Sequence, residues 1–87
     1  MRTEPWFEIQ IAIPGAPDHW FDPFAADPHG RFWATHEAVV AELPTMFRVP
    51  CRARIFKFWY SPEPDMPGHY RVNVEHDNQT YDAGPAA

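Results

Sequence analysis

The sequence has little of what small proteins use for cross-linking, membrane insertion or secretion. Its single cysteine, Cys51, excludes an internal disulfide, which is typical of proteins in a reducing cytoplasm. No apolar run approaches the ~18 residues that a membrane span needs. The first residues, MRTEP, lack the apolar stretch of a secretory signal. We therefore expect a cytoplasmic protein.

The sequence also lacks recognisable patterns for chemistry. Its four scattered glycines exclude a glycine-rich phosphate-binding loop. Neither Cys51 nor Ser61, the only serine, stands in a motif that supplies the base and the orienting group that a nucleophile needs. The histidines are not spaced as zinc ligands; His69 and His76, for example, would point to opposite faces of a strand. We predict no catalytic residues, no cofactor and no metal site, and a metal- or thiol-dependent enzyme is the weakest alternative.

Proline and aromatic residues are abundant instead. Eleven of the 87 residues are proline, and Phe, Trp and Tyr together make up 16% of the chain. So many aromatic side chains are atypical of disordered chains, and their burial can supply the core of one small domain. We therefore predict a single domain over residues 1–87 that ends in a flexible tail at 83–87.

Hydrophobic periodicity predicts three main strands. Residues 6–13 and 69–76 alternate between apolar and polar side chains, which indicates half-buried strands. Residues 51–60 are rich in β-branched and aromatic side chains and also favour a strand. Their alternation changes phase near Ile55, so either a bulge lies there or both faces of the strand are covered. Residues 79–82 can add a short edge strand.

One helix is predicted between the first two strands. Apolar residues at helical spacing place it from about Thr35, its N-cap, to Leu43. Pro44 is expected to end it, because proline cannot donate a backbone hydrogen bond within a helix. A longer helix capped by Asp27 is the alternative, although Gly30 weakens it.

The order strand, loop, helix, strand, strand predicts an α+β fold. It would be a small three- to four-stranded, mainly antiparallel sheet with one helix packed on one face. The loop of residues 14–31 contains four prolines but also Trp20, Phe21 and Phe24. Because a solvated linker does not usually carry three aromatic rings, we interpret it as an ordered loop whose rings either cover the core or face a partner.

Charge is distributed unevenly along the chain. The net charge is −5, but four of the seven basic residues fall within residues 48–57, and acidic residues dominate on both sides of that stretch. Acidic residues interleaved with tryptophan suit a protein partner with a basic surface, because opposite charge steers association and Trp is a common interface anchor. The predicted partner-binding residues are Asp18, Trp20, Phe21, Asp22, Asp27, Trp33 and Glu37.

The basic stretch supports an alternative function, a small nucleic-acid-binding module. Candidate contacts to nucleic acid or another anion are Arg48, Arg52, Arg54 and Lys57. Beside Phe56, Phe58 and Tyr60 they would bring cations and rings together, as in the platforms on which single strands stack. The acidic surroundings would repel a phosphate backbone, and cross-strand pairing of these cations with Glu8 or Glu75 is the simpler interpretation.

The segments WFEIQIAI, ATHEAVVAELP, CRARIFKFWY and HYRVNVEHD resemble in their layout small phage and mobile-element accessory proteins. In size, acidity and lack of catalytic motifs the chain is similar to anti-CRISPR inhibitors. The resemblance is architectural and extends over about residues 6–82. It implies a non-enzymatic, phage-encoded inhibitor in the host cytoplasm that binds a CRISPR effector or another host nucleoprotein complex. The basic stretch departs from a pure DNA mimic, which favours occlusion of a protein surface. An unpaired sheet edge would also allow a homodimer.

Overall fold

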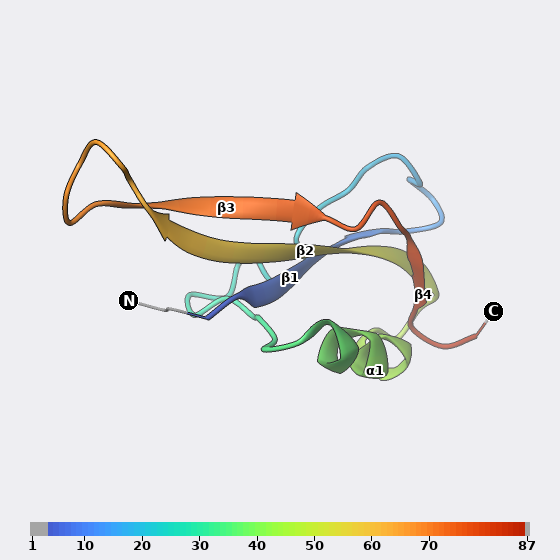
Figure 1. Ribbon diagram of the computed structural model, residues 1–87. Helices are drawn as coiled ribbons and strands as arrows, with labels where there is room; N and C mark the ends of the chain where they lie inside the picture. Colours follow the sequence, from blue (N-terminus) through green and yellow to red (C-terminus); the bar gives the residue numbers. More distant parts are fainter. Residues whose placement is uncertain (1–3, 87) are drawn as a thin grey trace.

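The computed structural model describes residues 4–86 as one helix and a four-stranded antiparallel sheet (Figure 1). The elements in chain order are β1 (Trp6–Ala12), α1 (His36–Met46), β2 (Cys51–Pro62), β3 (Tyr70–His76) and β4 (Tyr81–Ala83). The sheet order is β1-β2-β3, and β4 also pairs with β2. The predicted α+β fold, a mainly antiparallel sheet with one helix, is confirmed.

The central strand, β2, is regular along its twelve residues. Its antiparallel register with β1 runs from Arg52 opposite Ala12 to Phe58 opposite Trp6 without interruption. Its register with β3 is equally regular. No bulge therefore lies near Ile55. The second interpretation holds, because apolar side chains occupy both faces of β2 at this point.

β4 follows β3 along the same edge of β2. His76, the last residue of β3, lies opposite Phe56, and Tyr81, the first of β4, lies opposite Ala53. Four residues, 77–80, connect His76 to Tyr81. On β2, only Arg54 and Ile55 lie between the two opposite positions, Phe56 and Ala53. The connection therefore has two residues in excess and leaves the regular ladder.

The core lies between α1 and the first half of β2. Within it, Val39 and Leu43 of the helix are 0% and 1% exposed. The buried core cluster comprises Ile9, Ile11, Trp33, Val39, Leu43, Cys51, Ala53, Ile55 and Ala83. Cys51 is a small buried hydrophobe here, and burial raises the pKa of its thiol.

The helix begins where the sequence predicts but ends later. The Thr35 hydroxyl accepts a hydrogen bond from the backbone N–H of Ala38 at 3.1 Å, so Thr35 is the N-cap and the longer helix is wrong. The prediction that Pro44 ends the helix is also wrong, because α1 continues to Met46. Pro44 cannot bond the carbonyl of Val40, but Val40 is 38% exposed and water can satisfy that carbonyl.

The loop of residues 14–31 runs along the outer edge of β1. Phe21 and Ile11 exchange two backbone hydrogen bonds of 2.9 and 3.0 Å, and Trp33 and Phe7 exchange two of 2.8 and 2.9 Å. These isolated pairings cover the edge of β1 that β2 leaves open.

The flexible tail predicted at 83–87 starts too early, because the structure holds both Ala83 and Gly84 in place. Ala83 closes β4 and is 2% exposed, so it belongs to the core. The backbone N–H of Gly84 donates to the carbonyl of Leu43 at 2.8 Å. Glycine is required at that position, because a Cβ would lie 2.1 Å from the Val49 carbonyl oxygen and φ is +75°. Ala87 lies outside the described residues.

The β2–β3 hairpin extends well past the helix (Figure 1). The molecule is elongated, with principal extents of 50 × 27 × 24 Å. Because α1 packs against the start of β2 and against β4, the far half of the hairpin receives no cover from it. Within residues 4–86, no helix has the length and apolar content needed to cross a membrane.

Candidate binding surface

The face of the sheet that points away from the core carries a group of aromatic and valine side chains. Strand alternation and the register place its members on one side of the sheet. We call it the aromatic face, and it comprises Trp6, Phe56, Phe58, Tyr60, Tyr70, Val72 and Val74.

The aromatic face is packed within itself but open to solvent. The ring of Trp6 stacks on that of Phe58 with centroids 5.6 Å apart, and it lies 5.3 Å from the ring of Tyr60. On β3, Val72 and Val74 are 55% and 58% exposed. Exposed apolar side chains gathered on one face are a feature of many interaction surfaces.

A groove of about 370 Å³ lies on this face beside the 14–31 loop. Phe56, Phe58 and Val74 line it together with two acidic residues, Glu8 and Asp22. Glu8 accepts a hydrogen bond from the indole N–H of Trp6 at 2.8 Å, and Asp22 accepts one from the backbone N–H of Phe24 at 2.8 Å. Among residues 4–86, no ion pair neutralises either carboxylate. The groove therefore combines aromatic rings with negative charge.

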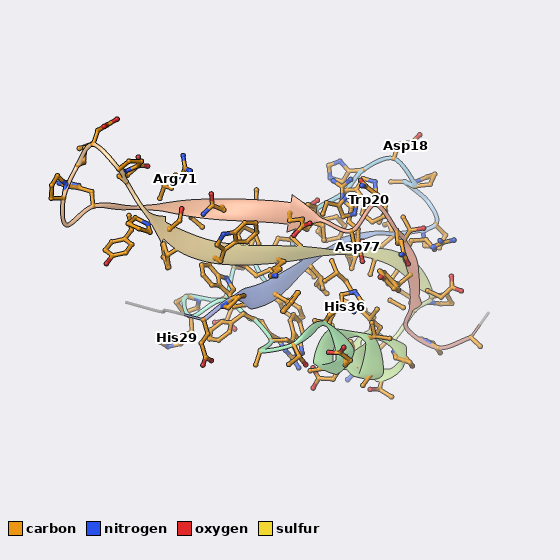
Figure 2. The ribbon with its side chains drawn as sticks, in the orientation of Figure 1. Asp18, Trp20, His29, His36, Arg71 and Asp77 are labelled. Atoms are coloured by element: carbon orange, nitrogen blue, oxygen red, sulfur yellow. The ribbon has the colours of Figure 1, made fainter. Side chains whose placement is uncertain are left out.

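The acidic residues predicted to bind a partner do not form one patch. Asp18, Asp22, Asp27 and Glu37 are all exposed. Figure 2 shows Asp18 at one end of the molecule, whereas His29, close to Asp27 in the sequence, lies toward the other. Of the four, Asp22 alone lines the groove on the aromatic face.

The aromatic residues of the predicted set have three different environments. Trp20 is half-buried and stacks under the Arg54 guanidinium, 4.5 Å from its ring centroid. Phe21 is 36% exposed, and its backbone pairs with β1. Trp33 is 7% exposed and belongs to the core, where its indole N–H donates to Glu42. Trp33 is thus wrong as a partner anchor, because backbone pairing with Phe7 turns it inward.

The four cations of the basic stretch, residues 48–57, contact different groups. Arg54 donates two hydrogen bonds, of 3.0 and 2.7 Å, to the Gln10 side chain. Arg52 donates to Thr80 and lies 3.5 Å from the Asp82 carboxylate. The pairing of Arg54 with Gln10 replaces the expected one with Glu8.

The two other cations of the basic stretch lie away from the aromatic face. Arg48 is exposed on the connection from α1 to β2. Lys57 occupies the opposite face of β2, with its ammonium 5.6 Å from the ring of Trp59. It lies across the ladder from Glu75, but the ion pairs of the described residues do not include these two side chains. The four cations therefore do not form one continuous anion-binding surface.

A polar cluster that the sequence does not reveal joins the helix to the β3–β4 connection. His36 Nε2 lies 3.2 Å from an Asp77 carboxylate oxygen and 3.1 Å from the Tyr81 hydroxyl, and Tyr81 also donates to Asp77 (Figure 2). Burial alone would raise the pKa of Asp77, but hydrogen bonds from Tyr81, the Gln79 N–H and His36 hold it below its usual value. Burial and the neighbouring Asp77 raise the pKa of Tyr81 to about 12. The turn signal at Asp77 was the only hint of this cluster in the sequence.

The cluster joins two segments that lie far apart in the sequence. Within the described part of the chain, no group of three or more His, Cys, Asp or Glu side chains could hold a metal ion. The Nε2 atom of His76 is buried beside Asp77, at 3.7 Å from its carboxylate, but makes no hydrogen bond. Two segments 41 residues apart, at His36 and Asp77, are fixed to each other by these contacts.

Comparisons with protein-family models, with curated protein sequences and with solved structures find no match.

Proposed function

We propose that this protein is a non-enzymatic binding protein that holds a basic segment of a protein partner on its aromatic face. The observation that supports the proposal is the groove in which Glu8 and Asp22 lie beside Phe56 and Phe58. A Lys or Arg side chain of the partner suits this groove, because its aliphatic stem packs on rings while its charged end reaches a carboxylate.

The nature of the partner follows from the same chemistry. Basic surfaces with long side chains are what nucleic-acid-binding proteins present to phosphates. A small acidic protein bound there would occlude the nucleic acid. An inhibitor of a host nucleoprotein complex in the cytoplasm, such as a CRISPR effector, fits this proposal. Nucleic acid itself is the less favoured ligand, because Arg52 and Arg54 already bind groups of this chain.

The carboxylates of the groove provide the test. We expect Glu8→Gln and Asp22→Asn each to weaken binding of a fluorescent peptide of alternating Arg and Leu by roughly two- to fivefold, and the double variant to weaken it more. Both substitutions keep an oxygen that can accept the hydrogen bond from Trp6 or from the Phe24 N–H. Fluorescence anisotropy at low and at physiological salt measures the affinity.

The matched control is Asp65→Asn, which removes one exposed charge on the hairpin turn, outside the groove. It should leave the affinity unchanged. Equal affinity of the double variant and the wild type would contradict the proposal. A pull-down from host lysate that returns no stable partner would also count against it.

A further inference from the structure

The outer edge of β3 has a defined set of unpaired backbone groups. The Glu63 N–H donates to the His69 carbonyl at 2.9 Å, which marks a hydrogen-bonded pair at the start of the β2–β3 ladder. Because hydrogen-bonded and non-hydrogen-bonded pairs alternate, every second residue from Tyr70 to His76 directs its N–H and C=O away from β2. The same alternation turns Phe7 and Ile11 outward on β1, where they bond to Trp33 and Phe21.

This edge is unprotected, unlike that of β1. In the described part of the chain β3 pairs with β2 alone, whereas the loop covers the outer edge of β1. Proteins usually block such an edge with proline, lysine or a bulge. Residues 70–76 contain neither proline nor lysine, and their register with β2 is unbroken. The edge can therefore accept another strand.

The sequence of β3 is complementary to itself in the antiparallel direction. A register centred on Asn73 is the one that pairs all seven residues of the strand with a second copy. It sets Arg71 opposite Glu75 of the other copy, twice by symmetry, and Val72 opposite Val74. The Arg71–Glu75 pairs fall at non-hydrogen-bonded positions, where facing side chains are closest. Arg71 lies exposed on β3 (Figure 2).

We propose that two copies of this protein associate through their β3 edges, centred on Asn73. The dimer forms one continuous sheet of the order β1-β2-β3-β3-β2-β1. Four outward-facing residues of each strand provide the backbone bonds, and two symmetric charge pairs fix the register. Val72 and Val74, which are 55% and 58% exposed, then pack against the same residues of the other copy. Both grooves open on the same face of the joined sheet.

Charge reversal tests the register directly. We expect the wild type to dimerise in sedimentation-velocity experiments over a concentration series. Arg71→Glu or Glu75→Arg alone creates two like-charge pairs and should raise the dissociation constant of the dimer by roughly tenfold or more. The double variant, R71E with E75R, restores opposite charges and should restore the affinity. Arg48→Glu, the same charge change on an exposed loop residue, is the control and should leave the dimer intact.

A backbone variant tests the edge independently of charge. Val72→Pro removes an N–H that points away from β2, so the hairpin keeps its own hydrogen bonds while the dimer loses one from each copy. This variant should be monomeric with an unchanged far-ultraviolet circular dichroism spectrum. A wild type that stays monomeric at all concentrations would overturn the proposal. So would a dimer that persists in Val72→Pro, or one that the double variant fails to rescue. These measurements need no partner, so they can fail without affecting the proposed function.

Discussion

Asp77 shows how a single residue connects distant parts of this chain. Its carboxylate receives hydrogen bonds from Tyr81 and from the Gln79 N–H, and it lies 3.2 Å from His36 Nε2. It therefore links the first residue of α1 to the connection that leads into β4. The side chain is 26% exposed, so the cluster is partly protected from water.

The lowered pKa of Asp77 predicts acid sensitivity. Because its folded-state pKa lies below the unfolded value, the carboxylate stabilises the fold above the ordinary Asp pKa, and this stability is lost as pH falls through the folded pKa. We expect Asp77→Asn to lower the free energy of unfolding by about 1–2 kcal/mol at neutral pH, with the difference shrinking in acid. Urea denaturation from neutral to acidic pH measures it. Asp65→Asn, outside the cluster, should show no such trend. If the difference in unfolding free energy between Asp77→Asn and the wild type stayed constant at all pH values, the role of the Asp77 charge would be refuted.

Trp33 and Cys51 show the limit of residue types as predictors. Tryptophan can anchor a protein partner and a cysteine thiol can react, yet Trp33 and Cys51 are both buried in the core cluster. The Trp33 environment depends on backbone pairing with Phe7, 26 positions earlier in the chain, which no local pattern around Trp33 contains. For Cys51, the position on a strand already favoured a buried small side chain.

At the scale of elements, the helix carries a proline in its last turns. Pro44 leaves the carbonyl of Val40 without a helical hydrogen bond, and both residues are exposed. The sequence predicts a helix end there because proline within a helix costs about 3 kcal/mol. Burial of Leu43, together with Met46 and Phe47 packed against the core, offsets this cost and extends the helix.

We expect Pro44→Ala to stabilise the protein. The alanine restores the hydrogen bond to Val40 and has the highest helix propensity, so the free energy of unfolding should rise by about 1 kcal/mol or more. Thermal and urea denaturation measure the change. Thr35→Ala, which removes the N-cap of the same helix, should instead lower stability by about 1 kcal/mol. A loss of stability in Pro44→Ala would mean that proline favours the path of the chain beyond the helix.

At the scale of the whole molecule, shape and charge act together. The molecule is 50 Å long, and the buried core cluster lies between α1 and the first half of β2. The aromatic face continues along the β2–β3 hairpin. A β3–β3 dimer would double this face and give two grooves, so a partner with two basic segments would gain avidity. The net charge of −5 would steer the molecule toward a basic surface.

The same charge predicts weak interaction with nucleic acid. Because the basic residues are dispersed and Arg52 and Arg54 bind neighbouring side chains, we expect no gel shift of single-stranded or duplex DNA and RNA probes at low salt. A salt-sensitive shift that Arg52→Ala or Arg54→Ala abolishes would instead favour the nucleic-acid-binding alternative. Arg71→Ala, a cation outside the basic stretch, is the control.

The sequence by itself determined the approximate strands and the α+β class, because period-two alternation is a local property of the chain. It favoured Thr35 as the N-cap over a longer helix capped by Asp27, and the hydrogen bond from Ala38 to Thr35 decided between them. It could not determine which face of the β2–β3 hairpin stays exposed, because alternation defines two faces without saying which one is covered. That depended on where an eleven-residue helix packs, and α1 reaches only one end of the sheet. The groove and the His36–Asp77–Tyr81 cluster likewise exist only in the folded chain, since each brings together residues that lie far apart in the sequence.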